Sequence, residues 1–219
     1  MTDLYVQYGS GNVFVDNWLN YDASPTLRIK KIPIVKHLIK RHVNFDKRIL
    51  YGDIVKGLPL ESGSVKGLFA SHVIEHLSYQ DAKTCLKNSF DLLKPGGCFR
   101  LIVPDLAFFI DKYQKGILSQ RVDKHSVAFE FNFHSGFGRK ESSVGFVNRI
   151  LSAFSNSAHL WMWDFQSLKT ELQDAGFVDV ETFEQGISED EMFLLPERDY
   201  QFFASIGHYG LAIQAFKPR

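Results

Sequence analysis

Short apolar runs alternate with stretches of helical periodicity along this chain. Such alternation is typical of βαβ units, in which helices cover a mainly parallel sheet. The apolar runs predict strands over residues 4–8, 18–21, 48–51, 65–70, 99–103, 178–183 and 210–216. The pattern therefore favours an α/β fold, with residues 1–219 forming a single domain.

Helices are expected over residues 32–41, 81–93 and 167–175. The second has the clearest apolar face at the 3.6-residue period, formed by Ala82, Cys85, Leu86, Ser89, Phe90 and Leu93. Ser78 and Asp81 predict its N-terminal cap, and the sequence Lys-Pro-Gly-Gly at 94–97 predicts its end.

The segment 106–164 interrupts this rhythm after the fifth predicted strand. It is long and rich in Phe, His, Ser and Gly. Insertions of this size in a compact domain usually form a lid or a binding element, although an extra packing layer is the alternative. His134, His159 and Trp161 within it are candidates for lining an acceptor pocket. Aromatic rings can in addition stabilise a sulfonium or an amine through cation–π contact.

A glycine turn, Gly9-Ser10-Gly11, follows the first predicted strand. Glycine lets the backbone approach a ligand closely, and the first turn of a doubly wound sheet is where nucleotide cofactors usually dock. Asp22 ends the second strand, where a carboxylate can accept hydrogen bonds from ribose hydroxyls. Each feature alone also suits an ordinary turn. Their occurrence together and in this order is what indicates a cofactor site.

Asp53 and Ile54 follow the third predicted strand in the same way. The Asp53 carboxylate can accept from an adenine amino group, with Ile54 against the ring. Because the carboxyl ends of parallel strands meet at one edge of a sheet, these positions are expected to lie together.

Two further motifs complete a family pattern: Ser-His-Val-Ile-Glu-His-Leu at 71–77 and Leu-Leu-Lys-Pro-Gly-Gly at 92–97. With the glycine turn, Asp22, Asp53 and Ala-Gly-Phe at 175–177, they resemble the ordered motifs of class I S-adenosylmethionine-dependent methyltransferases, and within these the type 11 group. The resemblance implies a doubly wound, seven-stranded Rossmann-like sheet with the last strand antiparallel and helices on both faces.

The resemblance also implies S-adenosylmethionine as cofactor. The turn at Gly9, Ser10 and Gly11 would line its methionine part, with Ser71 near that end; Asp22 would bind the ribose, and Asp53 with Ile54 the adenine. The chain departs from the family pattern at Gln7, where an acidic residue is usual, and at Val13, where a third glycine is usual. Gly11 and Asp22 are also too close for the usual first helix.

Candidate catalytic residues follow the fourth and fifth strands: His72, Glu75, His76 and Asp105. Methyl transfer depends mainly on positioning, and it needs a general base only when the acceptor must lose a proton. The stretch 72–76 is similar to the Glu-x-x-Glu-His motif of small-molecule N-methyltransferases, with His72 in the first position.

The same stretch reads His-x-x-Glu-His, a zinc-binding pattern. That pattern needs a long helix and a third ligand, so no metal is expected here. A nicotinamide dehydrogenase would need a third glycine in the turn, which the chain lacks. A non-catalytic protein that binds S-adenosylmethionine or S-adenosylhomocysteine is the alternative to the enzyme.

The composition of the chain excludes some classes of function. Lys plus Arg and Asp plus Glu are both 25, so there is no excess positive charge for binding nucleic acid. No signal peptide, and no apolar run of about 18 residues that would span a membrane, is visible. Two isolated cysteines suit a reducing cytoplasm. We expect a cytoplasmic methyltransferase acting on O or N of a small molecule, such as a sugar or cell-envelope precursor.

Overall fold

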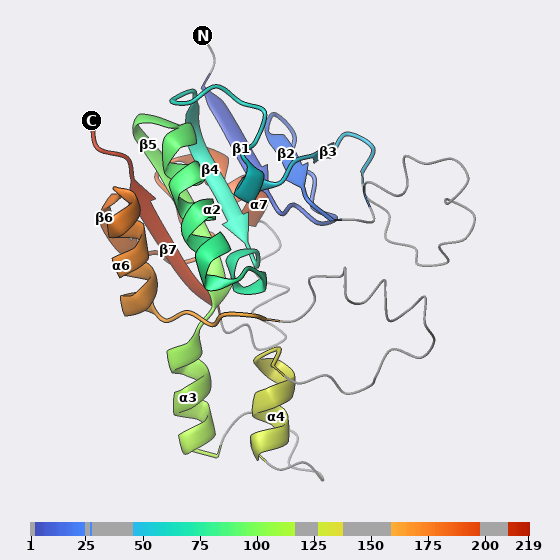
Figure 1. Cartoon of the computed structure of the whole chain (residues 1–219), viewed down its shortest axis with the longest axis vertical. Helices are drawn as coiled ribbons and strands as arrows, with labels where there is room; N and C mark the ends of the chain where they lie inside the picture. Colours follow the sequence, from blue (N-terminus) through green and yellow to red (C-terminus); the bar gives the residue numbers. More distant parts are fainter. Residues whose placement is uncertain (1–2, 25–26, 28–45, 117–126, 138–158, 198–209) are drawn as a thin grey trace, which may run out of the picture.

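The computed structural model describes residues 3–24, 27, 46–116, 127–137, 159–197 and 210–219 (Figure 1). Seven strands form one sheet in the order β3-β2-β1-β4-β5-β7-β6. The strands from β3 to β5 run parallel, whereas β7 runs antiparallel to both β5 and β6. Their bounds are β1 Leu4–Tyr8, β2 Leu19–Asp22, β3 Leu50–Tyr51, β4 Val65–Ser71, β5 Leu93–Pro104, β6 Val178–Thr182 and β7 Gly210–Phe216. The predicted sheet, with its last strand antiparallel, is confirmed.

The described helices connect these strands or lie at their ends. The α-helices are α2 Tyr79–Leu92, α3 Leu106–Gln114, α4 Val127–His134, α6 Phe165–Ala175 and α7 Leu194–Glu197. The 3-10 helices are η1 Ile54–Lys56, η2 Ile74–His76 and η3 Glu191–Phe193. The helix expected over 32–41 lies outside the described residues.

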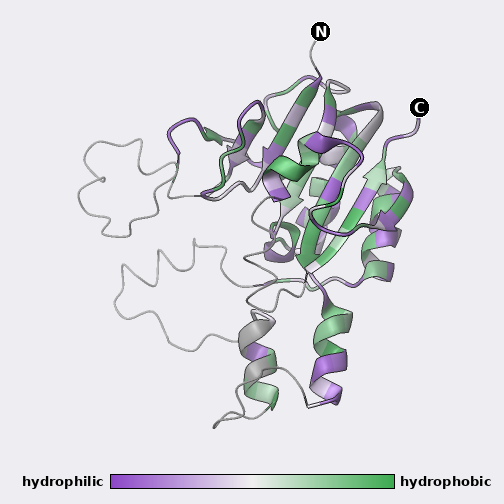
Figure 2. Cartoon of the chain, turned by 180° about the vertical axis from the view of Figure 1, so that it is seen from behind, coloured by the Kyte–Doolittle hydropathy of each residue, from purple (hydrophilic) through white to green (hydrophobic). Residues whose placement is uncertain are grey.

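Both faces of the sheet are covered. Helices α2 and α6 cover one face, where the main core includes Leu68, Leu86 and Leu172. On the other face Tyr5 and Trp18 pack against Phe193 of η3. Figure 2 shows that the central strands are largely hydrophobic, as expected for strands buried on both sides.

Helix α2 follows the predicted pattern. Ser78 accepts a hydrogen bond from the Asp81 backbone N–H, and the buried positions are Ala82, Cys85, Leu86, Ser89 and Leu92. Strand β5, however, begins at Leu93 rather than at residue 99. The Lys-Pro-Gly-Gly stretch is paired because Gly96 donates to the Lys217 carbonyl and Lys217 donates to the Gly97 carbonyl. These contacts with the end of the chain extend the strand through an apparent turn.

The connection from β1 to β2 contains turns and no helix, as the short spacing from Gly11 to Asp22 predicts. The buried Asn20 side chain holds this connection. Its amide donates to the carbonyls of Val15 and Trp18, and its carbonyl accepts from the Val15 N–H. One side chain therefore replaces hydrogen bonds that a helix would have made internally.

Helices α3 and α4 extend beyond the carboxyl ends of the parallel strands, away from both chain termini (Figure 1). They lie side by side, and Phe109 of α3 packs edge-on against Phe131 of α4. Both helices belong to the segment 106–164, which the sequence pattern predicts to be an insertion. Within the described residues, no helix combines the length and the apolar character that a membrane span needs.

Candidate functional site

The carboxyl ends of β1, β2 and β3 are joined by backbone hydrogen bonds. Ser10 donates to the Tyr21 carbonyl over 3.1 Å, and Gly52 donates to the Asp22 carbonyl over 3.2 Å. The glycine turn, Asp22 and the start of the Asp53 turn therefore lie together at one edge of the sheet, as expected from parallel strands.

Asp22 anchors this edge. Its Oδ2 accepts from the Gly11 N–H over 2.9 Å, and its Oδ1 accepts from the Ser24 N–H over 2.7 Å. Burial raises the pKa of Asp22, against the opposing effect of these two hydrogen bonds. The carboxylate is fixed between the two loops, and each oxygen retains lone pairs for a further donor such as a hydroxyl.

The glycine turn also touches the segment that follows β4. Gly9 has φ +65°, and a Cβ placed on it would lie 2.2 Å from Cγ2 of Val73. Val73 immediately precedes η2, which contains Glu75 and His76. The close approach thus brings the candidate cofactor turn against the candidate catalytic segment.

Alanine at Gly9 tests this approach. Gly9→Ala is expected to reduce the free energy of unfolding by about 1–3 kcal/mol more than Gly63→Ala, because overpacking costs about that much. Gly63 is a matched control: it also has positive φ, +73°, but no atom lies within 4 Å of its added Cβ. Urea denaturation of both variants measures the difference; equal losses would show that Val73 does not confine Gly9.

Asp53 caps η1, with Oδ1 accepting from the Val55 N–H and Oδ2 paired with Lys56 Nζ at 2.7 Å. Ile54 is buried in the main core, and its carbonyl accepts from the Asn88 amide. Both residues lie at the expected edge, and both have structural contacts of their own. Their assignment to adenine stays a prediction.

Two buried polar atoms at the end of β1 fit a polar ligand. Gln7 Oε1 and Ser10 Oγ are inaccessible to solvent, and neither has a hydrogen-bond partner among the described residues. An unsatisfied buried oxygen is costly unless a ligand or water supplies a donor. The ammonium of a methionine moiety would be such a donor, so the residues present suit the expected cofactor even though Gln7 replaces the usual acid.

The segment after β4 pairs a histidine with a buried carboxylate. Nδ1 of His72 lies 3.0 Å from Oε1 of Glu75, whose side chain is fully buried. His72 also adopts φ +55°, a backbone conformation uncommon outside glycine and often associated with functional sites. Ser71 is the last residue of β4, directly before this pair.

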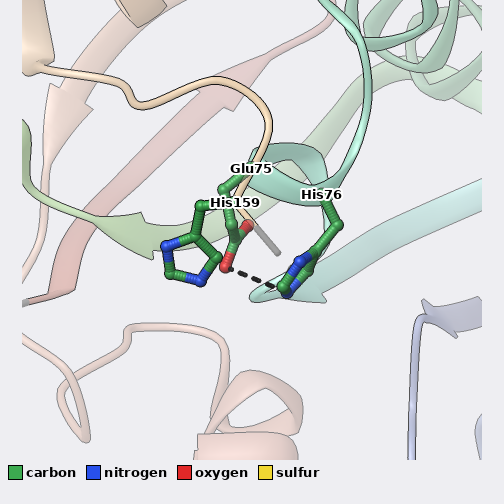
Figure 3. A group of neighbouring side chains, drawn as sticks. All are labelled: Glu75, His76 and His159. Atoms are coloured by element: carbon green, nitrogen blue, oxygen red, sulfur yellow. Dashed lines mark ion pairs between the residues drawn. The ribbon is translucent and has the colours of Figure 1, made fainter. Parts of the chain in front are cut away.

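His76 and His159 converge on the same carboxylate (Figure 3). Nε2 of His76 is 3.9 Å from Glu75 Oε1, and the His76 and His159 rings meet edge to face with centroids 4.9 Å apart. His159 Nδ1 donates to the Ser135 carbonyl over 2.6 Å. Burial lowers the pKa of His159, which favours its neutral form. The structure therefore unites His159 of the predicted acceptor group with the predicted catalytic group.

The other three candidate site residues, Asp105, Trp161 and His134, lie outside the histidine cluster or have undescribed side chains. Asp105 caps α3 by accepting from the Ala107 N–H, and it forms an isolated parallel bridge with Trp163. Trp161 is partly exposed and lies against Tyr79, with ring centroids 4.8 Å apart. His134 ends α4, and its side chain lies outside the described set. Asp105 and Trp161 thus border the site rather than joining the histidine cluster.

Comparison with known proteins agrees with this geometry. Residues 6–101 match the family described as methyltransferase domain. No match is found among the curated proteins. The match covers less than half of the chain, so over residues 6–101 the chain is similar to a methyltransferase domain, and S-adenosylmethionine is the cofactor that fits this family.

Solved structures share the fold over almost the whole chain. One belongs to the complex between the Haloferax volcanii Trm112 methyltransferase activator and its methyltransferase, with 14% identity, 99% of this chain and 83% of that chain covered, and a TM-score of 0.50. A possible exported protein from Bordetella parapertussis has 11% identity, with 99% and 62% covered and a TM-score of 0.52. The citrinin polyketide synthase CMeT domain has 13% identity, with 99% and 47% covered and a TM-score of 0.50. These likenesses show the fold alone.

Proposed function

We propose that this protein transfers a methyl group from S-adenosylmethionine to O or N of a small-molecule acceptor. One observation carries the proposal: the glycine turn, Asp22 and the His72–Glu75 pair share one edge of the sheet, linked by the contact of Gly9 with Val73. A cofactor sulfonium at that edge would lie beside a candidate general base.

Each cofactor portion has a partner in this proposal. The turn at Gly9 and Gly11, with the unsatisfied oxygens of Gln7 and Ser10, receives the methionine moiety. Asp22 accepts from the ribose hydroxyls, and Asp53 with Ile54 receives the adenine. The cofactor supplies an electrophilic methyl group, and the protein aligns the acceptor with it while excluding water.

His72 is the preferred base because Glu75 orients it. A base held by a third group is the usual arrangement for activating a nucleophile. Oε1 of Glu75 accepts from His72, and the full burial of Glu75 fixes the position of that oxygen. An acceptor hydroxyl would transfer its proton to His72 as the methyl group is transferred. A protonated amine would have to give its proton to His72 first, because only the neutral amine has the lone pair that attacks the methyl group.

The described parts of the segment 106–164, which are residues 106–116, 127–137 and 159–164, are proposed to cover the acceptor; the rest of the segment lies outside the described residues. The end of the segment is bound to the catalytic segment, because Leu160 and Trp161 both donate to the Glu75 carbonyl, over 2.7 and 3.2 Å. Helices α3 and α4 lie at the same end of the sheet. Sugars and cell-envelope precursors are suitable acceptors by family analogy. In this proposal residues 1–219 form a single methyltransferase domain.

A cytoplasmic location belongs to this proposal. Both cysteines, Cys85 and Cys98, are free thiols, and burial raises the pKa of each to about 12. Thiols with raised pKa values are unreactive, and these two form no disulfide with each other.

Replacing His72 by asparagine tests the base assignment. Asparagine tolerates positive φ, so the backbone should be preserved. Turnover, measured as S-adenosylhomocysteine formed with pooled amines and hydroxyl compounds, is expected to fall by about 10²–10⁴-fold, the usual contribution of a general base. Affinity for S-adenosylhomocysteine should stay unchanged; undiminished turnover would remove His72 from the mechanism.

A binding protein without turnover is the second candidate. The helix-free connection from β1 to β2, with Gln7 and Val13 in place of the usual residues, favours it because the cofactor wall is shortened. Its distinguishing result is cofactor binding with no transfer to any acceptor in the same pools.

A further inference from the structure

Three side chains from two distant segments of the sequence converge beside the proposed base. One potential ligand atom from each of Glu75, His76 and His159 lies within 4.8 Å of the others (Figure 3). Glu75 and His76 belong to η2, and His159 follows the segment beyond α4. Two imidazoles and one carboxylate form a common donor set for catalytic metal sites.

His159 has the orientation of a metal ligand. Because the Ser135 carbonyl can only accept, Nδ1 of His159 carries the proton and Nε2 has a free lone pair. A backbone carbonyl in this role is the usual outer partner that fixes the tautomer of a metal-binding histidine. Gly136 makes the arrangement possible, since a Cβ there would lie 2.5 Å from His159 Nδ1.

Glu75 supplies the second, independent indication of a ligand. Its side chain has no solvent exposure, and Oε2 has no hydrogen-bond partner among the described residues. Oε1 is already beside His72. A buried carboxylate oxygen without a donor is costly, and a cation is one means of compensating it.

We propose that Glu75, His76 and His159 bind one divalent transition-metal ion, of which Zn²⁺ is the representative. Bonds of about 2.0–2.2 Å to nitrogen and oxygen ligands require the donor atoms to approach to roughly 3.4 Å. Nε2 of His76 is 3.9 Å from Glu75 Oε1, so small side-chain rotations suffice for that pair. This set differs from the His-x-x-Glu-His zinc pattern, whose ligands are His72 and His76 on a long helix: here η2 is a single short turn, Glu75 is itself a ligand, and His159 takes the place of His72.

The role of the ion rests on the proposed function. Three protein ligands leave an open coordination position, which a hydroxyl or carbonyl oxygen of the acceptor can occupy. Coordination lowers the pKa of a bound hydroxyl and fixes its direction. The metal thus restricts the acceptor class to molecules with an oxygen donor.

Metal binding is measured on the cofactor-free protein, so the result is independent of methyl transfer. Metal-stripped protein is titrated with Zn²⁺ in a calorimeter and, in parallel, with Co²⁺, whose visible absorption reports coordination by nitrogen and oxygen. The variants are Glu75→Gln, His76→Gln and His159→Asn. The control is Glu61→Gln, at an exposed glutamate before the amino end of β4, opposite the end that carries the cluster, and thermal melting confirms that every variant is folded.

The expected result is one ion per chain, with affinity reduced at least about 100-fold in each of the three ligand variants, since even losing an outer partner costs about 10–100-fold. Glu61→Gln should bind the ion as the original protein does. Gly136→Ala, which keeps all three ligands but displaces the His159 ring, should also weaken binding. Absence of binding, or equal affinity in ligand and control variants, would overturn the proposal while leaving the cofactor site untouched.

Discussion

Glu197→Gln is expected to lower the free energy of unfolding by about 3–5 kcal/mol, the usual cost of leaving one partner of a buried ion pair without its counter-ion. Nη1 of Arg100 lies 3.0 Å from Glu197 Oε1, and both side chains are almost fully buried. Glutamine keeps the shape of Glu197 but removes the charge that faces the guanidinium.

Among the described residues, Glu197 is the carboxylate paired directly with Arg100. Its Nη2 donates to the Ile187 carbonyl, and its guanidinium stacks 3.5 Å above the centre of the Phe183 ring. Burial lowers the pKa of Arg100 and raises that of Glu197, so the pair is held in a costly environment by mutual attraction. Water cannot readily replace the missing carboxylate.

Chemical denaturation of Glu197→Gln and Glu189→Gln measures this effect. Glu189 is exposed in the same region, so its change should stay within about 0.5 kcal/mol. If the two variants were equally stable, the ion pair would contribute nothing to holding η3 and α7 against the sheet.

Asp22→Ala is expected to weaken binding of S-adenosylhomocysteine by about 1–3 kcal/mol, because the ribose hydroxyls lose their acceptor. At about 1.4 kcal/mol per tenfold, the dissociation constant rises roughly 5- to 150-fold. The upper end is expected here, since Asp22 also holds the N–H groups of Gly11 and Ser24. Isothermal calorimetry provides the measurement.

The matched control is Asp16→Ala, at an exposed aspartate paired with Arg48. The pH dependence gives a second check. Only the anionic Asp22 accepts from two hydroxyls, and burial raises its pKa above 3.8, so affinity should fall as the pH is lowered towards that raised value. The dependence should vanish in Asp22→Asn. Unchanged affinity in Asp22→Ala would mean that the ribose binds elsewhere.

The sequence predicted the sheet well because its strands are buried apolar runs that end in turn residues. The ends of β1, β2 and β3 fell where glycine and aspartate predicted them, and spacing alone predicted the missing helix before Asp22. The start of β5 was wrong, because Lys-Pro-Gly-Gly has the local preferences of a turn. Pairing with Lys217, far along the chain, overrides those preferences.

The histidine cluster was predictable only in part. His72, Glu75 and His76 are neighbours in sequence, so their proximity follows from local geometry. The His159 ring donates to the Ser135 carbonyl, and the next two residues donate to the Glu75 carbonyl; both are contacts between segments distant in sequence. The hydrophobic periodicity of the sequence predicts local structure and cannot predict contacts between distant segments. Asn20 was missed for the same reason, although a polar residue in a buried strand is a signal that it satisfies the backbone.

The central claim is that this sheet edge binds S-adenosylmethionine. Calorimetric titration of the purified protein with S-adenosylhomocysteine, with NAD as a parallel control, tests it most directly. Micromolar binding of S-adenosylhomocysteine alone is the predicted result. No heat and no thermal stabilisation with S-adenosylhomocysteine would contradict the account, and would mean that the altered glycine turn no longer holds the cofactor.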